Sequence, residues 1–129
     1  MKTMMAVAAF ALAVGSAHAE QLKTGTLIVY RKRSFFCGGR SLPFYVNGGL
    51  VAKLTNGYYY KLGLPVGEYT LTHDTILAGP DPQRVTVKAG QTIYFCNYCI
   101  TGSRVFEVAD DQDGARDSVQ HLKQQTWVK

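Results

Sequence analysis

The chain has 129 residues, 47% of them hydrophobic, and a formal net charge of +5 with its histidines neutral. This length fits one domain with one core. The positive charge favours solubility and attraction to anionic surfaces, but the basic residues form no recognition helix or RNP-type motif, so we expect no nucleic-acid partner.

The first residues have the layout of a secretory signal peptide. Lys2 precedes an apolar run, Met4 to Val14, and then the small-residue pattern Ala17-His18-Ala19, which predicts cleavage before Glu20. The apolar run is shorter than the roughly 20 residues of a spanning helix, and Glu20 stands where a lipoprotein would carry cysteine. We therefore expect a signal peptide over 1–19 and one soluble domain over 20–129, periplasmic or secreted, neither membrane-spanning nor a lipoprotein.

Short β-branched and aromatic runs, separated by turn residues, fill most of the remaining chain. The predicted strands are Thr26–Tyr30, Phe44–Val46, Leu50–Leu54, Tyr58–Leu62, Glu68–His73, Val85–Lys88, Thr92–Cys96 and Val105–Val108. Asn47-Gly48-Gly49 and Asn56-Gly57 indicate tight turns and hence two successive hairpins, a meander. Turn signals about 8 to 12 residues apart predict a mainly β fold, an antiparallel sandwich of about seven or eight strands.

A short helix is expected after the last strand. The aspartates that can cap its start are Asp110, Asp111 and Asp113. Ala115, Val119 and Leu122 then recur on one face. The pattern predicts an amphipathic helix over about 111–124, packed against a sheet or its edge.

Several strand and turn segments together resemble the DUF2846 family of small exported bacterial proteins. The segments that carry the resemblance are Gly25–Arg31, Val46–Gly48, Leu54–Tyr59, Pro65–Leu71 and a closing hairpin, Val87–Phe95. They cover roughly residues 24 to 110. The resemblance implies an immunoglobulin-like or transthyretin-like sandwich in the cell envelope, without established catalytic residues. Many relatives look like lipoproteins, from which this chain departs at Glu20, and its cysteines are not part of the family pattern.

The three cysteines, Cys37, Cys96 and Cys99, are disulfide candidates in an oxidising compartment. We expect a bridge from Cys37 to either Cys96 or Cys99, with one thiol left over, contributing about 3 to 4 kcal/mol. Cys96 and Cys99 also form a C-x-x-C, but the pair ends a strand without a βαβ pattern. A structural bridge is therefore favoured over a redox pair.

Two groups of side chains are candidates for binding a partner. Arg31 and Arg33 follow the first strand, and Arg40 joins them if the loop folds back; the alternative is a solvated strand end that discourages aggregation. In the run Tyr58 to Tyr60, alternation directs Tyr59 away from its two neighbours, so at least one face belongs to the core.

No catalytic constellation, metal site or cofactor motif is predicted. The favoured hypothesis is a non-enzymatic cell-envelope domain that binds a protein or polymer partner through a sheet face or loops. One alternative is a small exported thiol protein that uses Cys96 and Cys99. Another is an inhibitor-type module whose loop Ser34 to Leu42 enters the cleft of a partner.

Overall fold

The fold was obtained as a computed structural model that describes residues 23–35, 39–73, 82–100 and 103–128. The expected signal peptide and Cys37 lie outside these residues. The strands are β1 (Thr24–Tyr30), β2 (Leu42–Val46), β3 (Gly49–Leu54), β4 (Tyr58–Pro65), β5 (Gly67–His73), β6 (Gln83–Val87), β7 (Thr92–Ile100), β8 (Ser103–Val108) and β9 (Lys123–Gln124). The helix is α2 (Gln112–Val119).

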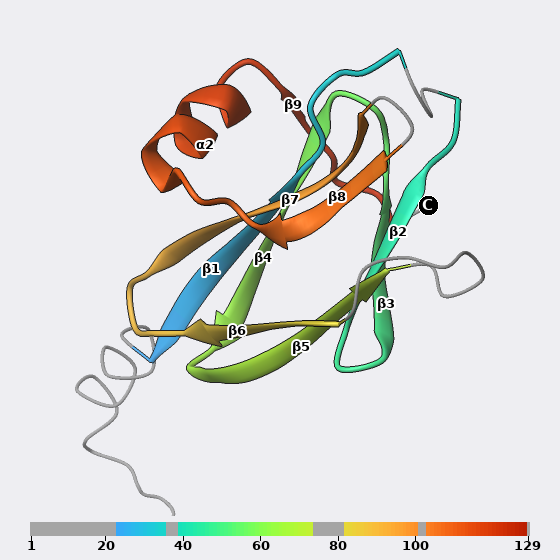
Figure 1. Cartoon of the computed structure of the whole chain (residues 1–129). Helices are drawn as coiled ribbons and strands as arrows, with labels where there is room; N and C mark the ends of the chain where they lie inside the picture. Colours follow the sequence, from blue (N-terminus) through green and yellow to red (C-terminus); the bar gives the residue numbers. More distant parts are fainter. Residues whose placement is uncertain (1–22, 36–38, 74–81, 101–102, 129) are drawn as a thin grey trace, which may run out of the picture.

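The strands form two packed sheets, as predicted for a β-sandwich. Sheet A has the order β8-β7-β1-β4-β9, and sheet B has the order β3-β2-β5-β6. Figure 1 shows α2 on the side of sheet A that faces away from sheet B. Each of the eight predicted strands is present. The two-residue β9 was not predicted because its residues, Lys123 and Gln124, carry no strand pattern.

Sheet A is not purely antiparallel, which the sequence did not indicate. β1 and β7 run parallel, in a register from Thr26 opposite Thr92 to Tyr30 opposite Cys96, and β4 and β9 are also parallel. Parallel neighbours need a long connection, and the chain between β1 and β7 provides it by building sheet B. Side-chain alternation is the same in both directions, so the sequence pattern alone could not distinguish them.

The predicted turns are present, but only some of them make hairpins. Asn47 and Gly48 have positive φ and join β2 to β3 in an antiparallel pair, as expected. The predicted meander is wrong, because the turn at Asn56-Gly57 leads from β3 in sheet B to β4 in sheet A. The predicted closing hairpin over Val87–Phe95 likewise crosses from β6 to β7. Apolar and polar residues alternate in strands that face each other across the core just as they do in strands that pair within one sheet. The sequence pattern therefore does not distinguish the two arrangements.

Sheet A is buried on both faces, which explains the continuous apolar run of β1. The core between the sheets contains Leu27, Val29, Phe44, Ala52, Leu54, Leu71, Val85, Val87, Ile93, Phe95 and Phe106. The buried cluster on the outer face of sheet A contains Ile28, Tyr30, Cys96, Ala109, Ala115 and Val119. The last two of these come from α2, so the apolar face predicted for the helix is confirmed.

The helix is shorter than predicted and is fixed at its start. Asp111 caps it, with Oδ1 accepting a hydrogen bond from the Gly114 amide at 2.9 Å. The Gln112 side chain binds the Tyr94 backbone in both directions, accepting from its N–H at 2.9 Å and donating to its carbonyl at 3.0 Å. The helix ends at Val119 because the chain then turns to place β9 beside β4.

The segment after β9 closes one side of the sandwich through Gln125, whose side chain is 1% exposed. Its backbone N–H donates to the Tyr59 carbonyl in sheet A at 2.8 Å. Its side chain accepts from the Thr55 amide at 2.9 Å and donates to the carbonyls of Lys53 and Trp127 at 2.8 Å. This one residue therefore ties the C-terminal segment to both sheets.

Replacing Gln125 with alanine should destabilise the protein by about 2 to 3 kcal/mol, because the amide of Thr55 and the carbonyl of Lys53 lose their partner. Gln124→Ala is the matched control, since that exposed side chain only accepts a long bond from Tyr59. Urea unfolding of both variants measures the difference. Equal stability of the two variants would contradict the role assigned to Gln125.

Candidate functional site

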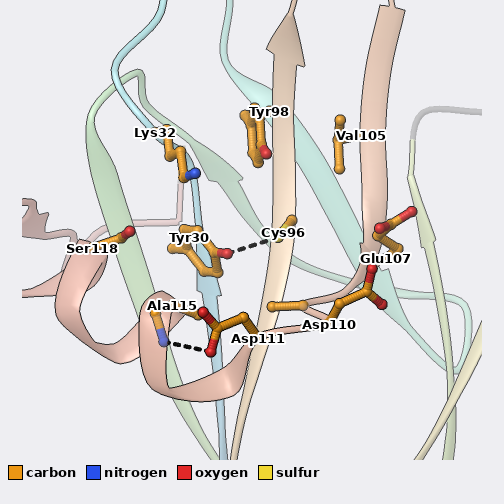
Figure 2. A pocket seen from close by; sticks show the side chains of 12 residues that line it. Tyr30, Lys32, Cys96, Tyr98, Val105, Glu107, Asp110, Asp111, Ala115 and Ser118 are labelled. Carbon is orange, nitrogen blue, oxygen red and sulfur yellow. Dashed lines mark hydrogen bonds between the residues drawn. The ribbon is translucent and has the colours of Figure 1, made fainter.

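A hollow of about 320 Å³ lies between α2 and the outer face of sheet A. Its lining residues come from β1, β7, β8, α2 and the segments next to them: Tyr30, Lys32, Cys96, Tyr98, Val105, Glu107, Ala109, Asp110, Asp111, Gly114, Ala115 and Ser118. Figure 2 shows these side chains around a common space. Two other described hollows, one beside Arg84 and one beside Lys23 and Lys88, are lined by uncharged residues and by cationic ones, with no carboxylate.

The floor of the hollow is formed by Tyr30 and Cys96, which are register neighbours on β1 and β7. A hydrogen bond of 2.8 Å joins the Tyr30 hydroxyl to the Cys96 sulfur, and both residues are buried. Burial raises the pKa of the Cys96 thiol, and it also raises the pKa of the Tyr30 hydroxyl. Both groups are consequently protonated at neutral pH, and the floor is uncharged.

Tyr98 and Lys32 extend the hollow beyond this pair. Tyr98 lies two residues after Cys96 on the same face of β7, with its ring centroid 6.5 Å from that of Tyr30. The Lys32 ammonium is 5.6 Å from the centroid of the Tyr98 ring, within the range of a cation–π contact. Burial raises the pKa of Tyr98 as well. Aromatic surface thus continues from the floor to the exposed lysine.

Carboxylates form the remaining rim. Glu107 lies on β8 opposite Cys96, and Asp110 and Asp111 lie between β8 and α2. All three are exposed, whereas Asp113 is outside the hollow and pairs with Arg116 at 3.3 Å. Three carboxylates and one ammonium give the hollow a formal charge of −2, in a chain whose formal charge is +5.

The predicted arginine patch is wrong for Arg31. Its side chain is fully buried and donates hydrogen bonds to the carbonyls of Leu54, at 2.8 Å, and Arg40, at 2.5 Å. The physical reason is alternation: residues 27, 29 and 31 point between the sheets, so Arg31 follows Leu27 and Val29 inward. Burial, with the nearby charge of Arg104, lowers the pKa of Arg31 to about 10.

Arg33 and Arg40 are exposed, as the prediction required, but neither lines the hollow. The Arg33 guanidinium lies beside Gly57, at the turn between β3 and β4. Arg40 contributes its backbone carbonyl to the bond from Arg31. A basic binding surface at these positions would therefore have to form without Arg31. The Arg31 side chain instead connects the segment after β1 to Leu54, at the end of β3, and to Arg40.

The alternation predicted for the tyrosine run is confirmed. Tyr58 and Tyr60 pack against the core between the sheets, and Tyr59 packs against the outer cluster of sheet A. Tyr59 is half-buried, and its hydroxyl donates to the Gln124 side chain at 3.4 Å. Tyr59 does not line the hollow, although it lies opposite Tyr30 in the register of β1 and β4 and packs against the same outer cluster.

The described cysteines differ in state: Cys96 is free and buried, and Cys99 is disulfide-bonded. Because Cys37 lies outside the described residues, the bridge from Cys37 stays a prediction. Cys96 and Cys99 are on opposite faces of β7 and three residues apart, or about 10 Å along a strand. A disulfide needs Cα atoms within roughly 7 Å, so the two cannot bridge each other in this fold.

Sequence reasoning missed most of this hollow. The sequence places Tyr30 in a strand and Asp110 at a helix start without assigning either a binding role, and it does not single out Lys32 or Glu107. One signal was available: Tyr30 alternates with the inward Val29, so an outer face that carries Ile28 and Tyr30 needs a cover. The predicted amphipathic helix supplies that cover. The inhibitor-type loop Ser34 to Leu42 includes residues 36–38, outside the described part, and stays a prediction.

In residues 23–35, 39–73, 82–100 and 103–128, no three His, Cys, Asp or Glu side chains gather closely enough to hold a metal ion. None of the described helices is long and apolar enough to cross a membrane. Comparison of the chain with known protein families, with curated proteins and with solved structures finds no match.

The raised pKa of Cys96 predicts an unreactive thiol, because less thiolate is present at any given pH. Under non-reducing conditions, Ellman's reagent should react with the native protein on the order of a hundred times more slowly than with the protein in urea. A Cys96→Ala variant should then show no reactive thiol. Rapid reaction of the native protein would contradict the buried, protonated state, and more than a single thiol in urea would contradict the predicted bridge from Cys37.

Proposed function

We propose that this chain is an exported, non-enzymatic binding domain of the cell envelope, which holds a cationic group of a protein or polymer partner in the hollow beneath α2. The observation that carries the proposal is the rim of Glu107, Asp110 and Asp111 around the aromatic floor. A basic protein that gathers carboxylates at its aromatic hollow favours an ammonium or guanidinium there.

The dimensions and surfaces of the hollow suit such a group. Its volume of about 320 Å³ is near the lower end of ordinary ligand pockets, which favours a small ligand or a side chain of a larger one. Tyr30 and Tyr98 supply ring surface against which a cation is stabilised while the carboxylates balance its charge. Recognition of this kind requires no covalent bond to be made or broken.

Binding is better supported than catalysis for the groups in this hollow. Cys96 is the strongest potential nucleophile, but burial keeps it protonated, and the Tyr30 hydroxyl that touches it also stays protonated, so no phenolate is present to act as its base. The redox alternative is weakened because Cys99 faces the opposite side of β7. Export and membership of the DUF2846 family remain part of the proposal, supported by the N-terminal segment and the strand and turn motifs.

The proposal is tested by titrating the isotope-labelled protein with N-acetyl-lysine methylamide, a monocation, and following backbone NMR signals. Millimolar ligand should shift the signals of residues around Tyr30, Cys96 and Glu107, whereas the norleucine analogue, which lacks the ammonium, should not. Glu107→Gln with Asp110→Asn should weaken binding by about tenfold or more, since 1.4 kcal/mol of lost attraction corresponds to that factor.

Asp113→Asn is the matched control, because it removes a carboxylate from α2 outside the hollow. It should leave the affinity for the monocation within about twofold of the unmodified protein. Equal shifts with the norleucine analogue, equal losses in the control and the double variant, or no shift in the hollow would each overturn the proposed function.

A further inference from the structure

The charges of the hollow are separated rather than paired. Lys32 lies two residues beyond Tyr30 in the chain, whereas Glu107 lies on β8, two strands away from β1. Cys96 lies between Tyr30 and Glu107 in the register, so two strand spacings, about 10 Å, separate the Cα atoms of Tyr30 and Glu107, and Lys32 follows Tyr30 past the end of β1. Figure 2 shows Lys32 beside Tyr98, with Glu107 and Asp110 on the other side of the Tyr30–Cys96 pair.

Within the described part of the chain, Lys32 makes no ion pair with these carboxylates, whereas Arg116 does pair with Asp113, outside the hollow. Burial is the main cause of the raised pKa of Cys96, and the nearby charges act on that pKa in opposite directions, since Glu107 and Asp110 raise it while Lys32 lowers it. Positive and negative groups therefore face one neutral floor from different sides, with ligand-sized space between them.

Such an arrangement matches a ligand that carries both charges. A monocation would satisfy the carboxylates but would leave Lys32 repelling it from the far side. A ligand with a second, negative group would turn that repulsion into attraction. Ser118, which faces the hollow from α2, adds a hydroxyl that can donate to a carboxylate.

We propose that the hollow binds a zwitterion about the size of one or two amino-acid residues, with its ammonium toward Glu107 and Asp110 and its carboxylate toward Lys32. This inference rests on the proposed function, because it assumes that the carboxylate rim receives a cation. It adds that Lys32 selects, among cationic ligands, those that also carry an anionic group at the other end.

The test compares N-acetyl-lysine with N-acetyl-lysine methylamide, which share the side-chain ammonium and differ in the free carboxylate. N-acetyl-lysine should bind at least about fivefold more tightly, a difference of roughly 1 kcal/mol, in the same NMR titration. N-acetyl-norleucine, with a carboxylate and no ammonium, should bind more weakly than either. The dipeptide Ala-Ala, a free zwitterion, forms a fourth arm.

Lys32→Gln should abolish the preference for N-acetyl-lysine while the methylamide still binds. Lys61→Gln, which removes an exposed charge from β4 outside the hollow, should retain the preference. Because Lys32 is exposed, the variant is expected to fold, and its NMR spectrum verifies this in the same samples. A preference that survives Lys32→Gln would overturn the assignment of the carboxylate to Lys32.

Equal affinity for N-acetyl-lysine and its methylamide would overturn the zwitterion proposal and leave the proposed function standing. Failure of both compounds to bind would overturn the two together. If N-acetyl-lysine binds, its rank against Ala-Ala identifies the source of the zwitterion. Tighter binding of Ala-Ala indicates a free small molecule, and tighter binding of N-acetyl-lysine indicates the C-terminal lysine of a peptide or protein chain, which carries both charges; either order agrees with a zwitterionic ligand.

Discussion

The pair of hydrogen bonds between the Gln112 side chain and the Tyr94 backbone holds the outer face of this molecule together. β8 pairs with β7 only as far as Val108 opposite Phe95, so the backbone of Tyr94 needs other partners. The Ala109 amide donates to its carbonyl at 3.0 Å, and Gln112 then binds both its N–H and its carbonyl. A side-chain amide thus continues the sheet by one position and fixes where α2 begins.

Once α2 is fixed, burial on both faces of sheet A explains the chemistry of the hollow. Ala115 and Val119 cover the outer side of β1 and β7, which removes Tyr30 and Cys96 from water without removing them from the hollow. Desolvation favours the neutral forms of a thiol and a phenol, so the floor carries no charge. Charge is confined to exposed side chains at the rim, where carboxylates and the Lys32 ammonium stand apart.

The sequence predicts the strands and the helix well because side-chain alternation and turn residues are local signals. It does not predict which sheet a strand joins: Asn56-Gly57 looks like a hairpin turn, yet β3 and β4 lie in different sheets. Direction is equally hidden, as the parallel β1 and β7 demonstrate. Arg31 shows why the candidate site is harder to predict than the strands. Its basic side chain suggests a surface patch, but its position in the alternation that continues from β1 buries it.

Hydrogen exchange of a Gln112→Ala variant tests most directly whether this anchoring builds the site. Amides of α2 and the Tyr94 amide should exchange at least about tenfold faster than in the unmodified protein, because the helix loses its fastening to β7. Amides in β5, within sheet B, should be unaffected, and N-acetyl-lysine methylamide should bind more weakly. Unchanged protection of α2 together with unchanged binding would contradict the account.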